Sequence, residues 1–219
     1  TKKLLFRFAD AARDYGGARE IVADIDPERA ARYLDEQIGA WLVHAELRGG
    51  ADALATAERL ARDALAGNAR MSRQAGASLR HKLALLLMLR AVRGGDASAL
   101  SEARQLFDAA LADSALLPAP ERARFHVDYG RSIGQLALAQ GNLAGLEQAE
   151  AEFGRGEALA RDAGVSATEI EARFRQVQSL YFRWTAAPTR ELRSLMMERL
   201  SGMIALLDAG EPDLLSARY

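Results

Sequence analysis

The three histidines, His44, His81 and His126, are the residues of this chain best suited to metal binding or proton transfer. None belongs to an HxxxH or HExxH pattern, which would place two zinc ligands on one helix face. His81 and His126 lie 45 residues apart, so a repeated helical unit would bring them into one row, but a metal ion needs further ligands. The chain has no cysteine, which excludes disulfides and thiolate ligands. We therefore expect solvated or hydrogen-bonded histidines, with no metal site and no cofactor.

Pairs of carboxylates are the other candidates for chemistry, and we expect them to be inert. Asp10 with Asp14 and Glu147 with Glu150 lie at helical spacing, but acid–base catalysis needs a pocket that shifts pKa values, and these pairs are predicted to face solvent. Gly154-Arg155-Gly156 lies inside a predicted helix, where close packing explains the glycines better than a phosphate loop does. A serine nucleophile elbow is also absent from the sequence. The sequence predicts that the chain is not an enzyme.

Composition favours a helical protein with no nucleic acid or lipid partner. The 219 residues are 49% hydrophobic but only 6% aromatic, which indicates a core of Ala and Leu. Charged residues make up 27% of the chain, and their charges nearly cancel to a net charge of −1. The protein therefore has no overall electric field that would attract nucleic acid or an anionic membrane. No run reaches the roughly 18 apolar residues of a membrane span, and no signal peptide is present.

The start of the chain leaves its compartment open. The first residue is Thr, so we expect preceding residues, which can include a signal, a membrane anchor or a further domain. Lys2-Lys3 would suit the cytoplasmic end of a membrane helix, with a solvated end as the alternative. We expect a soluble domain, cytoplasmic rather than exported, with a membrane tether as an alternative.

Hydrophobic periodicity and turn residues predict a series of helices. An amphipathic helix over residues 2–15 should end or kink at Gly16-Gly17, followed by a short helix over 18–24. The further helices are predicted over residues 27–48, 52–66, 70–93, 97–113, 120–140, 143–163, from a cap at Ser166 or Thr168 to before Pro188, and over 189–208. Leu83 to Leu89 is apolar on all sides, which indicates a central core helix. The segment Leu117-Pro118-Ala119-Pro120 is the clearest break, although the repeat described next continues across it.

A repeat organises these helices. After Gly49-Gly50, Gly95-Asp96 and Gly141-Asn142 the same stripe of small and apolar residues recurs, and Ala57, Ala103 and Ala149 lie 46 residues apart. The three stripes are Leu54, Ala57, Ala61, Ala64; Leu100, Ala103, Phe107, Ala110; and Leu146, Ala149, Phe153, Gly156. Because another amphipathic helix precedes each turn, the unit is a helical hairpin, and this period is typical of a solenoid.

The residues of the repeat resemble those of the tetratricopeptide repeat. Ser132 to Asn142 is similar to the first helix of that unit, with a small Gly134 and a Gly-Asn turn seven residues later. Ala103, Phe107 and Ala110 resemble the Ala-x3-aromatic-x2-Ala pattern of its second helix. The period is longer than the family's roughly 34 residues, and Gly130 stands in place of the aromatic residue usual near the start of the first helix. The resemblance extends over about residues 27–165.

The resemblance implies an all-α solenoid of about four stacked hairpins in one domain, 1–219. An N-terminal cap over residues 1–26 would precede hairpins at 27–67, 70–113, 119–164 and 166–208. It also implies that one face of the first helices lines a groove for a protein partner. The positions that match are Arg131, Gln135 and Leu138, then Leu85, Leu89 and Val92, and, one 46-residue step further, Val177, Tyr181 and Trp184. Two alternatives stay open: tight winding buries this face, or the face receives a helix or an extended peptide.

Two functional hypotheses follow. The first is a protein-interaction scaffold that holds a peptide, a helix or a second copy of the chain through the first-helix face. By analogy, its Arg- and Ala-rich, bacterial style of composition suits a secretion or exopolysaccharide-export assembly. The second is a ligand-sensing regulatory segment of a larger signalling or transcription-activating protein. The full-length gene product would discriminate between them, because a transmembrane helix favours the first and a DNA-binding or nucleotide-binding domain favours the second.

Overall fold

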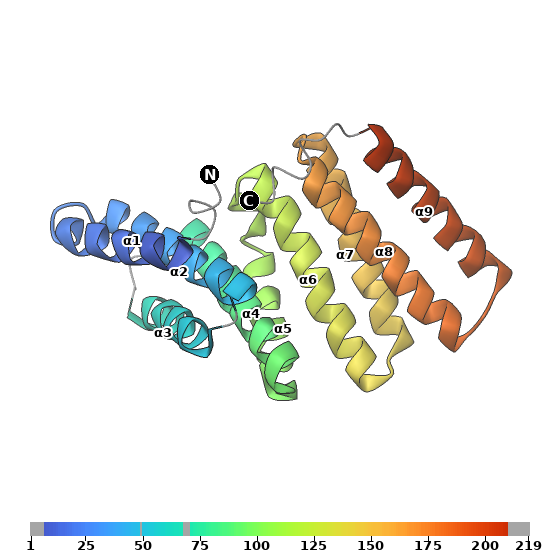
Figure 1. Ribbon diagram of the computed structural model, residues 1–219, viewed down its shortest axis with the longest axis horizontal. Coiled ribbons are helices and arrows are strands. Elements are labelled where there is room, and N and C mark those ends of the chain that lie inside the picture. Colours follow the sequence, from blue (N-terminus) through green and yellow to red (C-terminus); the bar gives the residue numbers. More distant parts are fainter. Residues whose placement is uncertain (1–6, 49, 68–70, 210–219) are drawn as a thin grey trace. The chain divides into compact units, whose positions relative to one another are not determined.

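The computed structural model describes residues 7–48, 50–67 and 71–209, and every regular element in these ranges is a helix (Figure 1). The α-helices are α1 (Phe8–Val22), α2 (Pro27–Arg48), α3 (Ala51–Gly67), α4 (Arg73–Gly94), α5 (Ala97–Leu111), α6 (Ala119–Gln140), α7 (Leu143–Asp162), α8 (Ser166–Ala186) and α9 (Arg190–Ala209). A short 3-10 helix, η1 (Ser114–Leu116), follows α5. The all-helical fold predicted from composition and periodicity is confirmed for these residues.

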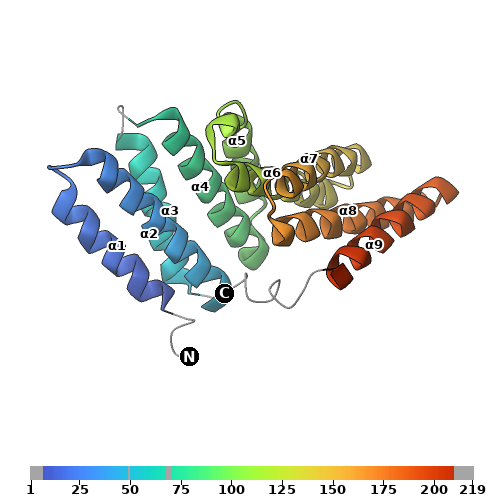
Figure 2. The same ribbon diagram turned by 90° about the horizontal axis from the view of Figure 1, so that it is seen from above.

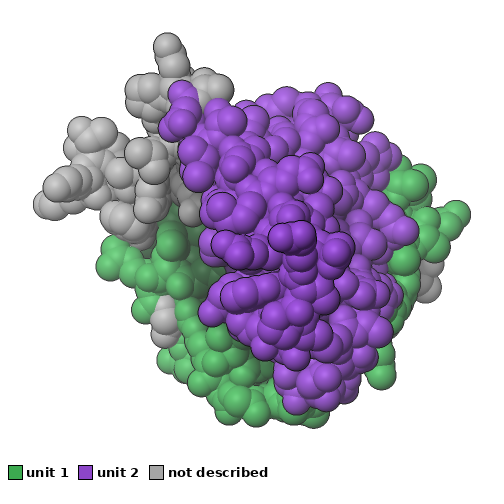
Figure 3. All heavy atoms as spheres, turned by 90° about the vertical axis from the view of Figure 1, so that its right-hand side faces the viewer, with its two compact units in different colours: residues 1–116 green, residues 117–219 purple. Residues whose placement is uncertain are grey.

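The helices form two compact units, which are coloured separately in Figure 3. Unit 1 comprises residues 1–116 and unit 2 comprises residues 117–219. The division falls at Leu117-Pro118-Ala119-Pro120, where the sequence shows its clearest break. Pro118 precedes α6 and Pro120 lies in its first turn, the place where a missing backbone N–H costs nothing.

Glycine followed by an Asx residue makes the turn inside two of the hairpins. Gly95 and Gly141 end α4 and α6 at φ of 68° and 64°, a left-handed conformation that costs other residues energy. The next residue then caps the next helix: Asp96 accepts from Ser98 N and Ala99 N at 3.0 and 3.2 Å, and Asn142 accepts from Gly145 N at 3.2 Å. Two adjacent residues therefore stop one helix and start another.

Helix α4 is the core of unit 1. It packs on α2, α3 and α5, and its neighbour α2 also packs on α1 (Figures 1 and 2). Leu83, Leu86, Leu87 and Met88 are each no more than 3% exposed, so the apolar run predicted to be covered all round is a buried core segment. The ring of His81 lies 5.7 Å from that of Phe107 on α5, which brings a titratable side chain into the same core.

The glycines of α1 do not break the helix, contrary to the sequence-based prediction. Helix α1 runs without interruption from Phe8 to Val22 through Gly16 and Gly17, and residues 2–6 of the predicted first helix lie outside the described part. Gly16 is buried against α2, where a Cβ would lie 2.6 Å from Nε2 of Gln37. Gly16 thus allows a close helix contact, and tertiary packing outweighs the low helix propensity of the pair.

In unit 2, α7 packs between α6 and α8, and α9 packs on α8 (Figures 1 and 2). Gly130 and Gly156 set the close approach of α6 and α7. A Cβ on Gly130 would lie 2.7 Å from the Phe153 ring, and one on Gly156 would lie 2.7 Å from a Val127 methyl group. Close packing thus explains Gly156 as predicted, whereas nothing lies within 4 Å of a Cβ placed on Gly154.

Helix α8 begins at Ser166, which is earlier than a cap at either Ser166 or Thr168 would allow. Its first helical residue is Ser166, so Val165 occupies the N-cap position and no side chain caps the helix. Thr168 lies within the first turn and is buried. The prediction of a Ser166 or Thr168 cap is therefore wrong. The preceding helix ends as predicted, because Gly164 adopts a φ of 70°.

The starting residues of six helices follow the 46-residue step that the sequence shows. Helices α2, α4 and α6 begin at residues 27, 73 and 119, and α3, α5 and α7 begin at residues 51, 97 and 143. Ala57, Ala103 and Ala149 each lie six residues after the start of their helix and are fully buried. Three helix pairs of the chain therefore share their start positions and a buried alanine.

Candidate functional site

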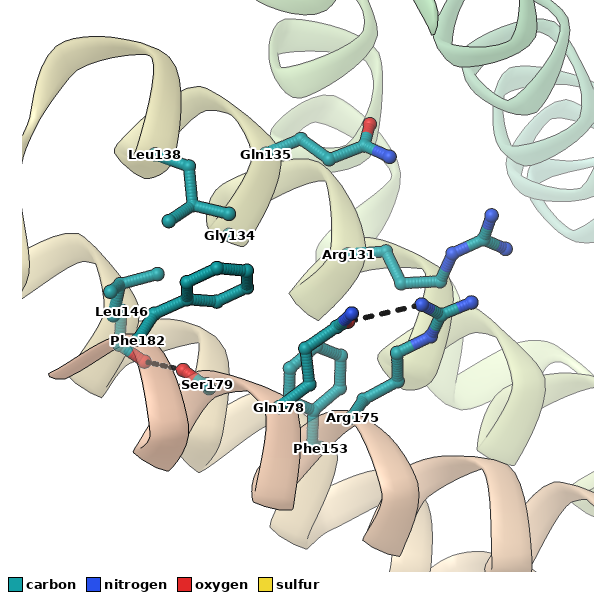
Figure 4. Close-up of a pocket in the computed structure, with 10 residues that line it drawn as sticks. All are labelled: Arg131, Gly134, Gln135, Leu138, Leu146, Phe153, Arg175, Gln178, Ser179 and Phe182. Atoms are coloured by element: carbon teal, nitrogen blue, oxygen red, sulfur yellow. Dashed lines mark hydrogen bonds between the residues drawn. The ribbon is translucent and has the colours of Figure 1, made fainter. Parts of the chain in front are cut away.

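A hollow of about 70 Å³ lies within unit 2, over α7 and between α6 and α8 (Figure 4). Four lining residues come from α6, two from α7 and four from α8. They are Arg131, Gly134, Gln135 and Leu138; Leu146 and Phe153; and Arg175, Gln178, Ser179 and Phe182. Their spacing of three and four residues along each helix places each set on one helix face.

The two ends of the hollow differ in chemistry. Figure 4 shows the guanidinium groups of Arg131 and Arg175 side by side at one end, and Leu138, Leu146 and the Phe182 ring at the other. The Ser179 hydroxyl is already engaged, because it donates to the Leu146 carbonyl at 3.2 Å. The site thus has a cationic end and an apolar end.

A chain of ion pairs holds the two arginines in place. Asp128, whose side chain is fully buried, accepts from Arg131 Nη1 at 2.9 Å and from Arg124 Nε at 2.9 Å. Arg124 Nη1 also donates to Glu171 Oε2 at 2.7 Å, and Glu171 lies 3.6 Å from Arg175 Nη2. Buried carboxylates paired in this way fix the positions of their arginines strongly.

The cationic end carries hydrogen-bonding capacity that the fold does not use. Arg175 donates from Nη1 to Gln178 Oε1 at 3.2 Å, but buried Nε of Arg175 and buried Nε of Arg131 have no hydrogen-bond partner. The side-chain oxygen of Gln135 also lacks one. Burial, and then the neighbouring charge of Arg131, lower the pKa of Arg175 from its ordinary value. These groups are polar and desolvated, and the fold leaves them without hydrogen-bond partners.

The hollow brings together three of the nine predicted groove residues: Arg131, Gln135 and Leu138. On α8 its lining residues are Arg175, Gln178 and Phe182, whereas the prediction named Val177, Tyr181 and Trp184. In unit 1, Leu85 and Leu89 are half-buried and Val92 is 64% exposed. Arg175 and Phe182 could have been identified only by knowing which side of α8 points toward α6 and α7, and the sequence does not show this.

None of the nine predicted groove residues is fully buried. Tyr181 is 50% exposed, and Val177 and Trp184 are half-buried. Further large apolar side chains are exposed on α8 and on the following helix, α9. They are Phe174 on α8 and Leu195, Met197, Ile204 and Leu207 on α9. Helix α9 has no fully buried residue within its described length.

His126 and two buried glutamates form ion pairs between or along the helices of unit 2. His126 Nδ1 lies 2.8 Å from Glu152 Oε2, both side chains are buried, and Arg155 pairs with the other oxygen of Glu152. Within the described ranges no three His, Asp or Glu side chains cluster in a way that would hold a metal ion. Glu157, also buried, pairs with Arg161 and Arg173, an ionic core that the sequence analysis did not identify.

Glu150 is the predicted solvent-facing carboxylate that the structure places differently. Its side chain is only 17% exposed and pairs with Arg183 at 2.8 Å, while its Oε1 is buried without a hydrogen-bond partner. Burial raises the pKa of Glu150 although the nearby Arg183 opposes this. Glu147, by contrast, is 60% exposed, and Asp10 is 38% exposed, as expected for surface residues.

Comparisons with known proteins add little to this description. No protein-family model matches the chain, and no curated protein matches it. A solved structure described as "DHF58 filament" is similar over 92% of this chain and 86% of its own, with 22% sequence identity and a TM-score of 0.31. A score this low supports no inference about arrangement or function. Among the described helices, none is both long and apolar enough to cross a membrane.

Proposed function

We propose that this chain is a protein-interaction module, a tetratricopeptide-like array of helical hairpins that holds a peptide, a helix or a second copy of itself. The observation that carries the proposal is the 46-residue recurrence of helix starts and of fully buried Ala57, Ala103 and Ala149. Units that repeat in this way bury one face on their neighbours and leave other faces for partners. A place in a larger bacterial assembly, such as one for secretion or exopolysaccharide export, is part of the same proposal.

The exposed apolar side chains of α8 and α9 are the part of unit 2 best suited to a protein partner. Tyr181 combines a large ring with a polar tip and is 50% exposed, and Trp184 lies one helical turn further on α8. Residues of these types supply much of the binding energy of protein interfaces. We therefore assign the partner face to the Tyr181 and Trp184 side of α8.

Site-specific photo-crosslinking in the cells that make the protein tests this assignment. A photoreactive amino acid in place of Tyr181 should give a discrete adduct, which mass spectrometry identifies as another protein or as a second copy. The same amino acid in place of Gln148, an exposed polar residue of α7, is the matched control. Once the partner is known, Trp184→Ala should weaken its binding by more than about 1 kcal/mol.

Equal labelling from both positions, or no adduct from Tyr181, would argue against a partner face on α8. The melting temperature of the Trp184→Ala variant has to be measured beside its affinity. A loss of several kcal/mol in stability, as expected for truncation of a fully packed aromatic side chain, would assign Trp184 to packing.

A further inference from the structure

We propose that the hollow of unit 2 binds a carboxylate group carried on a short apolar stem. Either a small organic acid or the side chain of an acidic peptide supplies such a group, and the hollow would recognise both by the same contacts. The inference goes beyond the proposed function, because a free acid can occupy the hollow without any protein partner.

The cationic end of the hollow has the geometry of an anion site. Arg131 and Arg175 come from different helices, and their guanidinium groups lie side by side at the rim (Figure 4). Two like charges in a partly buried place repel each other, and an anion between them removes that cost. A guanidinium group presents several N–H donors in a planar fork that matches a carboxylate. Buried Nε of each arginine has no hydrogen-bond partner within the protein, so the fold leaves both guanidinium groups with unused donors.

The charges around the hollow favour an anion with a single charge. The ion-pair chain of Arg131, Asp128, Arg124, Glu171 and Arg175 joins three guanidinium groups to two carboxylates. One positive charge is therefore left over within this chain. A carboxylate would neutralise it, whereas a phosphate dianion would leave an excess of negative charge near buried Asp128.

The apolar end of the hollow limits what is attached to the carboxylate. Leu138, Leu146 and the Phe182 ring line this end, and they offer no charged group to a ligand. The volume of about 70 Å³ exceeds several-fold the roughly 15 Å³ that one water molecule requires. A stem of a few carbon atoms fits this space, and a nucleotide or a whole helix does not.

The test is a titration of the full chain, labelled with nitrogen-15, with butyrate. The arginine Nε–H signals report directly on the groups that would bind. Butyrate should shift the signals of Arg131 and Arg175 in a saturable way, and the uncharged butyramide should not. Arg175→Gln should weaken butyrate binding at least tenfold, whereas Arg193→Gln, at an exposed position of α9, should leave the affinity unchanged.

A second variant keeps the test decisive if Arg175→Gln disturbs the fold. Gln178 is exposed and its Oε1 accepts from Arg175 Nη1 at 3.2 Å, so Gln178→Glu should fold normally. Its new carboxylate should lie against the cationic end of the hollow and abolish butyrate binding. The backbone amide spectrum of each variant establishes that it is folded.

Binding measurements with two short peptides identify the source of the carboxylate. A capped Ala-Glu-Ala peptide that binds more tightly than butyrate assigns the hollow to an acidic protein partner. Tighter binding of the free acid assigns it to a small ligand and favours a ligand-sensing role for the chain. The Ala-Gln-Ala peptide is the control and should not bind.

The proposal is overturned if the two arginine signals show no saturable shift below about 50 mM butyrate, a concentration beyond the millimolar range of weak specific binding. It is equally overturned if butyramide binds as well as butyrate, or if Gln178→Glu leaves binding intact. None of these results bears on the cross-linking experiment at Tyr181, so the two proposals fail independently.

Discussion

At the scale of single residues, two glycines of α6 differ in whether the surrounding structure leaves room for a Cβ atom. Gly130 and Gly134 lie one turn apart on the helix that faces α7. A Cβ on Gly134 would meet only Ala149 Cβ at an ordinary 3.6 Å, whereas one on Gly130 would lie 2.7 Å from the buried Phe153 ring and 3.1 Å from the Ala149 carbonyl oxygen. The sequence analysis singled out Gly134 as the small residue of the repeat, but Gly130 is the one that close packing requires.

We predict that Gly134→Ala raises the free energy of unfolding by about 0.5–1 kcal/mol, because alanine loses less backbone entropy in a helix. Gly130→Ala should lower it by about 1–3 kcal/mol, because the Phe153 ring must move to admit the methyl group. Urea unfolding of both variants measures the difference. The same sign for both variants would contradict the packing described for α6 and α7.

The burial of Glu150 leads us to predict that the stability of the protein depends on pH. Its pKa in the folded protein is raised above the ordinary value of 4.5, mainly by burial, so the folded state binds the proton more tightly than the unfolded state does. Stability should therefore fall as the pH rises from 4.5 through the folded-state pKa, and the full cost of burying the charge is present above that window.

The substitution Glu150→Gln removes this titration. The melting temperature of the variant, relative to that of the unaltered protein, should increase as the pH is raised from about 4 to about 7. Glu147→Gln serves as the control, because Glu147 also pairs with Arg183 but is 60% exposed. A difference that stays constant with pH, or that decreases, would show that the Arg183 ion pair outweighs the cost of burial.

At the scale of helices, the glycine and Asx pair in two of the hairpin turns encodes both a helix end and a helix start. Asn142 directly follows the left-handed Gly141, and its side-chain oxygen accepts from Gly145 N at 3.2 Å. These contacts lie within a few residues of one another, so the local sequence is enough to produce each of these two turns. This explains why the boundaries of α4 to α7 could be predicted to within about three residues.

Loss of this cap should destabilise the protein. Asn142→Ala should lower the free energy of unfolding by about 1 kcal/mol, since one N–H group of the first turn of α7 loses its acceptor. Asn142→Asp is the matched variant that keeps an acceptor next to the positive helix end, and it should be neutral or stabilising. Chemical unfolding measures both changes. If alanine proves as stable as aspartate here, the cap contributes nothing to the hairpin.

At the scale of the whole molecule, the sequence was enough to predict the helical class, most helix boundaries after α1 and the 46-residue recurrence. All three depend on local signals: hydrophobic periodicity, left-handed glycines, Asx caps and prolines act within a few residues. The same signals placed the clearest break at Leu117 to Pro120, where the division between the two compact units falls. Whether the two units act as one array of hairpins stays a prediction.

Which side of each helix faces which neighbour depends on tertiary packing and could not be predicted from the sequence. A step of 46 residues from Arg131 leads to Val177, but the hollow is lined by Arg175, two positions earlier. Two positions turn a helix by about 200°, so this small shift in register selects a different face. The burial of Glu150 and the uninterrupted course of α1 through Gly16 have the same origin. In each case residues distant in sequence, such as Arg183 and Gln37, supply the surroundings that determine the outcome.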